Sequence, residues 1–274
     1  MTLYLHGLGH FHPENEITNR FLEDLEIATD DAWILERVGI RSRRTVLPLD
    51  YIRTTRNREP RAALEAALYD NAQMGRCAAT AALARAGIAK SDIGLVIAGG
   101  SAPDTASPAE ACNIARALEL EVPAFDIASA CTSLLAQIHW LACMDPSRLP
   151  GFVLLVVPEG LTRTVDYSDR SAAVLWGDGA VAAVVSTRIP GRAQVLDTSF
   201  GSNPLHADKV VIPRLGHFRQ HGRVVQAFAI RRTAQLFDGL RERHTDVDRR
   251  LHFVGHQANL RMLESVCREC RIPP

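Results

Sequence analysis

The sequence passes from a strand-like segment to an apolar helix at Ala124-Phe-Asp-Ile-Ala-Ser-Ala-Cys131-Thr-Ser-Leu-Leu135. Val122–Ile127 has the pattern of a strand, and Ser133–Met144 has that of a mostly buried helix. Free backbone N–H groups at a helix start favour an anion, so we expect the Cys131 thiol to have a lowered pKa. Small residues before Cys131 suit a tight turn and leave room for a substrate. The junction predicts a nucleophilic cysteine, and the alternative is a buried structural one.

Strand-like and helix-like segments alternate around this junction. This alternation predicts an α/β fold with a largely parallel sheet. The expected elements before residue 190 are strands at Ile93–Ala98, Phe152–Val157 and Ala180–Val185 and a helix at Ala109–Leu120.

The alternation starts again in the last third of the chain. The expected elements are strands at Ala193–Phe200 and Leu251–Val254 and helices at Val224–Arg243 and Leu260–Glu269. We therefore predict two βα halves, residues 1–190 and 191–274, of which the first offers more elements.

The amino-acid composition excludes several classes of protein. The chain has 274 residues, 47% of them hydrophobic and 23% charged, which excludes disorder for the bulk of the sequence. Equal numbers of basic and acidic residues argue against a protein that mainly clamps nucleic acid. We see no membrane span and no export signal. Six scattered cysteines are too few for a disulfide scaffold, so we expect a reducing cytoplasm.

A second junction of a strand and a helix carries a histidine. It lies in Leu251-His-Phe-Val-Gly-His256-Gln-Ala-Asn259-Leu-Arg261. A lone histidine is more often structural than catalytic. If the two halves pack against each other, however, Cys131 and His256 could meet at one site.

At these residues the chain resembles the β-ketoacyl-acyl-carrier-protein synthase III family of the thiolase-like superfamily. The resemblance covers nearly the whole chain, and its strength comes from the order of the motifs. The matching stretches are Gly7 to Asn19, Trp33 to Arg41, the Cys131 segment, Asp169 to Ala180, Gly222 to Ile230 and Gly255 to Arg261.

The resemblance implies a fold of two pseudo-repeated βα halves that form an α/β/α/β/α layered sandwich. It also implies an acyltransferase that condenses an acyl-CoA primer with malonyl-acyl carrier protein, with loss of CO2, in fatty-acid or related polyketide and secondary-metabolite biosynthesis. Cys131 would carry the acyl group, and His256 would donate a hydrogen bond to the developing enolate. Coenzyme A thioester is then a substrate, and neither a cofactor nor a metal is expected. The resemblance also implies a homodimer.

The resemblance also assigns binding roles. Trp33 and Arg170 match positions that hold the adenine of coenzyme A, which fits the stacking of an aromatic face and a guanidinium on a base. Arg37 and Asn259 match positions near the pantetheine and phosphates, and Arg261 matches a residue that contacts the carrier protein. The plainer alternatives are a core aromatic for Trp33, a surface ion pair for Arg170 and a solvated helix charge for Arg261.

Some features depart from the family. The family also uses an asparagine loop and a glycine-rich loop that lie further along than Pro274, so we expect this sequence to lack the end of its second half. A ketosynthase-like partner subunit without catalysis is the alternative function. Val38, Gln226 and Ala227 differ from the usual residues and favour a specialised pathway. Cys267-Arg-Glu-Cys270 could be half of a zinc or redox site, but it has no second ligand pair.

Overall fold

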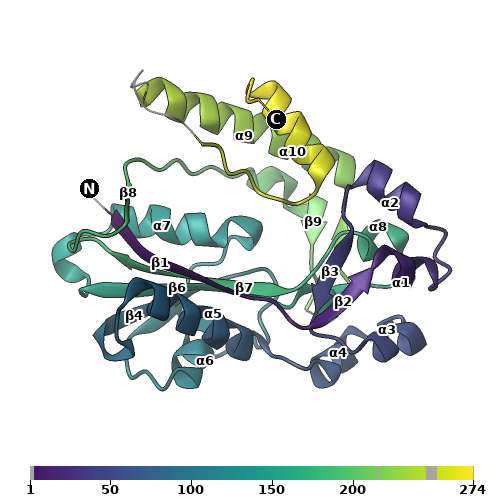
Figure 1. Cartoon of the computed structure of the whole chain (residues 1–274), viewed down its shortest axis with the longest axis horizontal. Helices are drawn as coiled ribbons and strands as arrows, with labels where there is room; N and C mark the ends of the chain where they lie inside the picture. Colours follow the sequence, from purple (N-terminus) through teal and green to yellow (C-terminus); the bar gives the residue numbers. More distant parts are fainter. Residues whose placement is uncertain (1–2, 215, 245–251, 274) are drawn as a thin grey trace.

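The computed structural model describes residues 3–214, 216–244 and 252–273, and its centre is a six-stranded sheet (Figure 1). The strand order is β5-β4-β6-β7-β1-β8. Only β5, β4 and β6 run parallel to one another, and the other pairings are antiparallel. The prediction of an α/β fold is confirmed, but the sheet is mixed rather than largely parallel. The strands are β1 Leu3–Phe11, β4 Ile93–Ala98, β5 Ala124–Asp126, β6 Phe152–Glu159, β7 Gly179–Ser186 and β8 Ala193–Val195.

Strand β1 belongs to the antiparallel part of the sheet, where it pairs with β7. Helix α5, Asn71–Ala86, covers β1 closely. A Cβ on Gly7 would lie 2.5 Å from the carbonyl oxygen of Ala82, and one on Gly9 would lie 2.1 Å from that of Ala78. Only glycine at these two positions lets the strand and helix backbones approach so closely. The Gly7-Leu-Gly9 motif is therefore a packing device of the first strand.

Helices lie on both faces of the sheet. Helices α5 and α6, Glu110–Ala117, lie on one face, and α7, Ser133–Cys143, lies on the other (Figure 1). Helices α9, Gly222–Arg243, and α10, Leu260–Glu269, pack on each other beyond α7. Helix α7 is less buried than its sequence predicts, since Leu135 is 66% exposed and Trp140 is 46% exposed.

A smaller unit stands at the end of the sheet where α1 and α2 lie (Figure 1). This unit contains two short two-stranded sheets, one formed by β2 and β3 and the other by β9 and β10. The remaining bounds are β2 Asn15–Thr18, β3 Ser42–Thr45, β9 Val210–Val211, β10 Arg219–Gln220, α1 Asn19–Glu23, α2 Asp31–Arg37, α3 Leu49–Thr55, α4 Pro60–Ala66 and α8 Arg170–Ala173.

The predicted second round of alternation is only partly present. Both predicted helices exist, as α9 and α10, but the strand predicted at Ala193–Phe200 is only β8 and pairs with β1 of the first sheet. His252–Val254 is not a strand, and Leu251 lies outside the described residues. Within the described ranges, no helix has both the length and the apolarity needed to cross a bilayer.

The core has two main parts, one on each face of the sheet. The larger cluster fills the space between the sheet and α5 and α6, and includes Met74, Ile114 and Leu154. The smaller cluster lies under α7 and includes Leu141 and Leu155. Alternate residues of β6 thus point to opposite faces, as the period of two in a strand requires. This packing fixes the edge of the sheet at which Cys131 follows β5.

Candidate active site

Cys131 lies in a 3₁₀ turn, Ala130–Thr132, between β5 and α7. Ala130 has a φ of 46°, a left-handed conformation that is unusual for a residue with a side chain, so the predicted tight turn is present. The Ser133 hydroxyl accepts from the Ser129 N–H at 2.9 Å and donates to the Ala130 carbonyl at 2.7 Å. These contacts hold the turn in a shape that leaves Cys131 exposed.

Asp126, the last residue of β5, ties this corner to α6. Its two carboxylate oxygens accept from the N–H groups of Glu110 and Ala111, each at 2.8 Å. These N–H groups begin α6 and have no partner within the helix. Sequence reasoning missed this contact, although an acidic residue at a strand end was a visible signal.

The Cys131 thiol has a raised pKa, which contradicts the predicted direction. The residue as a whole is accessible to solvent, but the atoms packed around its thiol desolvate the sulfur, and this desolvation is the main cause. The negative charge of Glu159 adds to it. A hydrogen bond from the backbone of Cys131 itself acts in the opposite sense but is weaker. The cysteine precedes the first residue of α7, so desolvation outweighs the stabilisation that a helix start gives to an anion.

Glu159 is a second ionisable group of this region that sequence reasoning missed. It ends β6, and its Oε1 accepts from the N–H of Ser101 at 2.6 Å and from the Ser101 hydroxyl at 2.8 Å. Burial raises the pKa of Glu159 to about 7, against the effect of these hydrogen bonds. A pKa near neutrality is suited to proton transfer.

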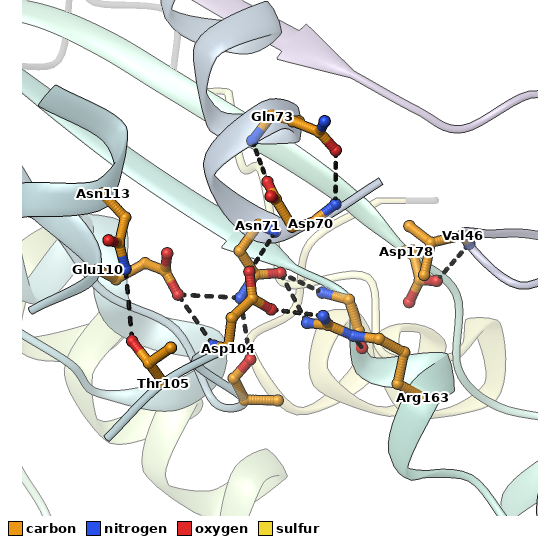
Figure 2. A network of polar contacts seen from close by, with 12 residues as sticks. Val46, Asp70, Asn71, Gln73, Asp104, Thr105, Glu110, Asn113, Arg163 and Asp178 are labelled. Carbon is orange, nitrogen blue, oxygen red and sulfur yellow. Dashed lines mark hydrogen bonds and ion pairs between the residues drawn. The ribbon is translucent and has the colours of Figure 1, made fainter. Parts of the chain in front are cut away.

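A buried polar network joins Asn71, Asp104 and Arg163 (Figure 2). Arg163 forms an ion pair with Asp104 and donates to the Asn71 amide oxygen at 3.0 Å. The Asn71 oxygen also accepts from the N–H of Gly160, the residue after Glu159, at 3.1 Å. The network therefore fixes the end of β6 from several sides.

Asp178, from the Gly177-Asp-Gly179 turn, is a second buried carboxylate that accepts several hydrogen bonds. Its carboxylate accepts from the Thr162 N–H at 2.8 Å and from the Thr162 hydroxyl at 2.5 Å. It also accepts from the Val46 N–H at 2.7 Å (Figure 2). Burial nevertheless raises the pKa of Asp178 to about 6. The motif thus joins β3, β7 and the segment after β6.

His256 lies in an irregular segment that leads into α10, and its side chain is exposed. Partial desolvation lowers the pKa of its imidazole, so the ring is neutral at pH 7. Within the described ranges, no hydrogen bond joins the His256 imidazole to the Cys131 thiol. The meeting of these two side chains stays a prediction.

The structure brings three of the predicted coenzyme A residues together. The Arg170 guanidinium carbon lies 4.8 Å from the centre of the Trp33 ring, and that of Arg37 lies 5.6 Å from it. Arg170 also donates to the Ala28 carbonyl at 2.6 Å. Trp33 is half-buried rather than a closed core aromatic, and Arg170 stacks on it instead of forming the surface ion pair of the alternative reading.

Asn259 and Arg261 join this region from α10. The Asn259 side chain caps α10 by accepting from the Met262 N–H at 2.8 Å. Arg261 donates to the Glu36 carbonyl at 3.0 Å and pairs with Glu264 at 3.1 Å. Both residues thus have structural contacts, and their predicted binding roles stay predictions.

The linings of two surface hollows of the described residues do not include Cys131. One, of about 420 Å³, follows α6 and β5 and includes Cys112 and Arg116, and the other, of about 450 Å³, is lined by His12, Pro13, Glu14 and Arg44. Among the residues that the structure describes, no three His, Cys, Asp or Glu side chains form a group that could hold a metal. Cys267 and Cys270 are free, and Cys270 packs against Val266 and Ala234.

Comparisons with known proteins identify the fold and family. A family model described as 3-oxoacyl-[acyl-carrier-protein] synthase III matches residues 125–204. The β-ketoacyl-[acyl-carrier-protein] synthase III of Oceanobacillus iheyensis is 32% identical over 270 residues, which are 97% of this chain and 79% of the relative. The chain belongs to the β-ketoacyl-acyl-carrier-protein synthase III family.

Two solved structures agree with this assignment. That of the 3-oxoacyl-[acyl-carrier-protein] synthase III from Aquifex aeolicus superposes with a TM-score of 0.85 at 27% identity, covering 99% of this chain and 82% of its own. The priming β-ketosynthase of the R1128 polyketide biosynthetic pathway gives a TM-score of 0.80 at 25% identity, covering 99% of this chain and 79% of its own. The predicted thiolase-like fold is therefore confirmed.

Proposed function

We propose that this synthase III family member is an acyltransferase that condenses an acyl-CoA primer with malonyl-acyl carrier protein, with loss of CO2. The observation that carries the proposal is the exposed Cys131 at a strained turn on the carboxyl edge of the parallel strands. Ligand sites in α/β sheets form at this edge. The pathway is fatty-acid or related polyketide and secondary-metabolite biosynthesis.

In the first half-reaction, the sulfur of Cys131 attacks the thioester carbonyl of acyl-CoA. A bond forms between this sulfur and the acyl carbon, and the bond from that carbon to the coenzyme A sulfur breaks. Coenzyme A leaves as a thiol after it takes up one proton. The burial that raises the pKa of Cys131 keeps its thiol protonated at rest, so attack requires a proton acceptor.

In the second half-reaction, malonyl-acyl carrier protein loses CO2 and its carbanion attacks the acyl-Cys131 thioester. The neutral His256 imidazole donates a hydrogen bond to the enolate oxygen that develops. Its lowered pKa suits this role, because a neutral imidazole stabilises the enolate without surrendering its proton. The bond from the acyl carbon to the Cys131 sulfur breaks, and the sulfur leaves as a thiolate that takes up one proton from solvent, which restores the thiol.

The stack of Trp33 and Arg170 is our candidate adenine site. Their separation of 4.8 Å leaves no room for a base between them, so coenzyme A would displace Arg170 and take over its face of the indole. Arg37 lies over the same ring and is placed to meet the phosphates. Asn259 and Arg261, at the contact of α10 with α2, would extend this surface towards the pantetheine and the carrier protein.

We further propose a cytoplasmic homodimer. Strand β5 is the last strand of the sheet, and its Phe125 is 39% exposed, which leaves one edge available for a second copy. All six cysteines are free, as expected in a reducing compartment.

The test is the mass of the intact protein after incubation with acetyl-CoA and longer acyl-CoAs. The expected result is the addition of one acyl group, which is lost in Cys131→Ala and kept in Cys143→Ala, a matched change at another exposed cysteine. Malonyl-acyl carrier protein should then discharge the acyl group as a β-ketoacyl product. An absent acyl adduct would contradict the proposal and favour a partner subunit without catalysis.

A further inference from the structure

One segment of the second half carries a positive charge that the chain as a whole lacks. Basic and acidic residues are equal in number over the 274 residues, but residues 204–224 contain four basic residues and one aspartate. The aspartate, Asp208, pairs with Lys209 at 2.6 Å. The other three basic residues have no carboxylate in their own segment, and we call them the arginine surface: Arg214, Arg219 and Arg223.

All three members of the arginine surface are exposed. Within the described ranges, no residue forms an ion pair or a side-chain hydrogen bond with any of them. Val224, which is 46% exposed, follows Arg223 in the chain. Val210, which is 45% exposed, pairs in the two-stranded sheet with Gln220, the residue after Arg219. Arginine next to exposed apolar side chains is typical of protein interfaces.

The two-stranded sheet of β9 and β10 is anchored through Phe218, the residue before β10. The Phe218 N–H donates to the Thr164 carbonyl at 2.8 Å, and the Phe218 ring packs against that of Trp176 with 4.7 Å between their centres. The Nε2 of the preceding residue, His217, donates to the Asn57 carbonyl at 2.6 Å. These contacts fix the backbone that carries the arginine surface.

These anchors place the arginine surface near the edge of the main sheet at which Cys131 lies. Thr164 ends the turn that follows β6, and Trp176 comes shortly before β7. The last residue of β6, Glu159, pairs with the first residue of β7, Gly179. Strand β6 runs in the same direction as β5, so its end shares an edge with the turn that carries Cys131.

Arg261 is the residue that the resemblance assigns to the carrier protein, but its guanidinium is already engaged. It donates to the Glu36 carbonyl at 3.0 Å and pairs with the Glu264 carboxylate at 3.1 Å. An acidic partner would compete with that carboxylate for Arg261. At the arginine surface it would meet no such competitor among the residues that the structure describes, so an acidic protein gains more there.

We propose that the arginine surface is the main docking site of malonyl-acyl carrier protein, which it binds through acidic residues of the carrier. This proposal rests on the proposed function, because that function requires the carrier to bring a malonyl thioester to Cys131. Three positive charges in one segment repel one another, and a negatively charged protein surface relieves that repulsion. The exposed side chains of Val210 and Val224 would be covered in the same contact.

Recognition of the two substrates would then be divided. Coenzyme A has its candidate site at Trp33 and Arg170, on α2 and α8. The carrier protein meets Arg219 of β10 and Arg223 of α9. The charges of the arginine surface should therefore affect condensation with the carrier protein and leave acyl transfer from coenzyme A unchanged.

The test measures condensation by the full chain with two malonyl donors. One is malonyl-acyl carrier protein, and the other is malonyl-pantetheine, which has the thioester arm without the protein. The double variant Arg219→Glu/Arg223→Glu should raise the KM for malonyl-acyl carrier protein by about tenfold, because two attractions become repulsions. Condensation with malonyl-pantetheine and acylation by acetyl-CoA should stay as in the wild type.

Arg188→Glu/Arg192→Glu is the matched control. Both arginines are exposed and follow β7, whose last residue, Ser186, lies at the opposite edge of the sheet from Gly179. The control changes the net charge equally but should leave the KM for malonyl-acyl carrier protein unchanged. An equal rise in both double variants would show an effect of net charge alone and would overturn the proposal.

Two other outcomes would assign the arginine surface to a different partner and also overturn the proposal. A similar rise in the KM for acetyl-CoA would mean that the arginines hold the phosphates of coenzyme A. The second outcome is binding to phosphatidylglycerol vesicles that Arg219→Glu/Arg223→Glu abolishes, together with an unchanged KM for malonyl-acyl carrier protein. It would mean that this surface contacts a membrane.

Direct binding separates a failure of the docking site from a failure of the proposed function. If the wild-type chain is not acylated by any acyl-CoA, the proposed function fails. The dissociation constant of fluorescently labelled malonyl-acyl carrier protein, measured by anisotropy, still tests the docking site. It should rise by about tenfold in Arg219→Glu/Arg223→Glu. Absent binding to the wild type, or equal binding to both chains, would refute the docking site.

Discussion

The Cys131 corner is held by hydrogen bonds within the sheet and its own turn, whereas the His256 corner is held from outside by a contact between two helices. The strand before Cys131 pairs with β4, and Ser133 closes the turn itself. The segment before α10 has no strand partner in its described part. Its position depends on α2, where the Val38 carbonyl accepts from the Leu260 N–H at 3.0 Å.

This difference links the His256 corner to the candidate coenzyme A site. Helix α2 carries Trp33 and Arg37, and its last turn receives both Leu260 and Arg261. A change in the contact of α2 with α10 would therefore move the histidine and the substrate residues together. The Cys131 corner should be insensitive to such a change.

The largest expected effect is chemical and separates the two corners. His256→Ala should keep the acyl-Cys131 adduct but lower condensation by about 10²- to 10³-fold, because only the enolate loses its hydrogen bond. The measurement is intact mass for the adduct and product formation from malonyl-acyl carrier protein. An equal loss of both steps would mean that His256 acts already in acyl transfer.

The next effect concerns the buried carboxyl groups around the Cys131 corner. The pKa values of Glu159, about 7, and Asp178, about 6, exceed their usual values, so the folded chain binds these protons more tightly than the unfolded chain. Their contribution to stability is complete below pH 4 and is lost as the pH rises to about 7, at a cost of up to roughly 3 kcal/mol for each group.

Urea unfolding at pH 5 and at pH 8 measures this loss. Glu159→Gln, which does not titrate, should lose less stability over that interval than the wild type. An equal loss in both proteins would show that Glu159 is ionised throughout the interval in the folded state.

A smaller effect tests the helix contact at the His256 corner. Gly39 has a φ of 70°, and a Cβ there would lie 2.7 Å from that of Leu260. Gly39→Ala should lower the free energy of unfolding by about 1–2 kcal/mol for the left-handed backbone and by about 1–3 kcal/mol more for the collision. It should also raise the KM for acyl-CoA, since α2 carries Trp33.

Gly87→Ala is the matched control, with a φ of 67° and no atom within 4 Å of the new Cβ. In urea unfolding, it should lose only the about 1–2 kcal/mol of free energy of unfolding that comes from the left-handed backbone. If the two variants lose the same stability, the contact between α2 and α10 does not hold this corner.

The smallest expected effect comes from the cap of α10. Asn259→Ala removes the acceptor for the Met262 N–H and should cost about 1 kcal/mol of stability, measured by urea unfolding. Gln257→Ala, at an exposed position of the same segment, should cost far less. If Asn259→Ala raises the KM for acyl-CoA more than Gln257→Ala does, Asn259 binds the substrate as well as capping α10.

Local patterns predicted most elements but not their pairing. The bounds of α10 match the predicted Leu260–Glu269, and β4 matches the predicted Ile93–Ala98. Both segments carry an unbroken periodic signal between clear breaks. The direction of β7 against β6 left no such signal, because an apolar strand buried on both faces looks alike in parallel and antiparallel sheets.

By itself, the sequence determined the α/β class, the family through the order of its motifs, and the turn that carries Cys131. These features depend on residues close together in the chain. Only the tertiary structure revealed the raised pKa of Cys131, the Glu159 Oε2 that is buried without a hydrogen-bond partner among the described residues, and the stack of Arg170 on Trp33. Desolvation and charge interactions depend on neighbours that are distant in sequence, and only the packed chain brings those neighbours together.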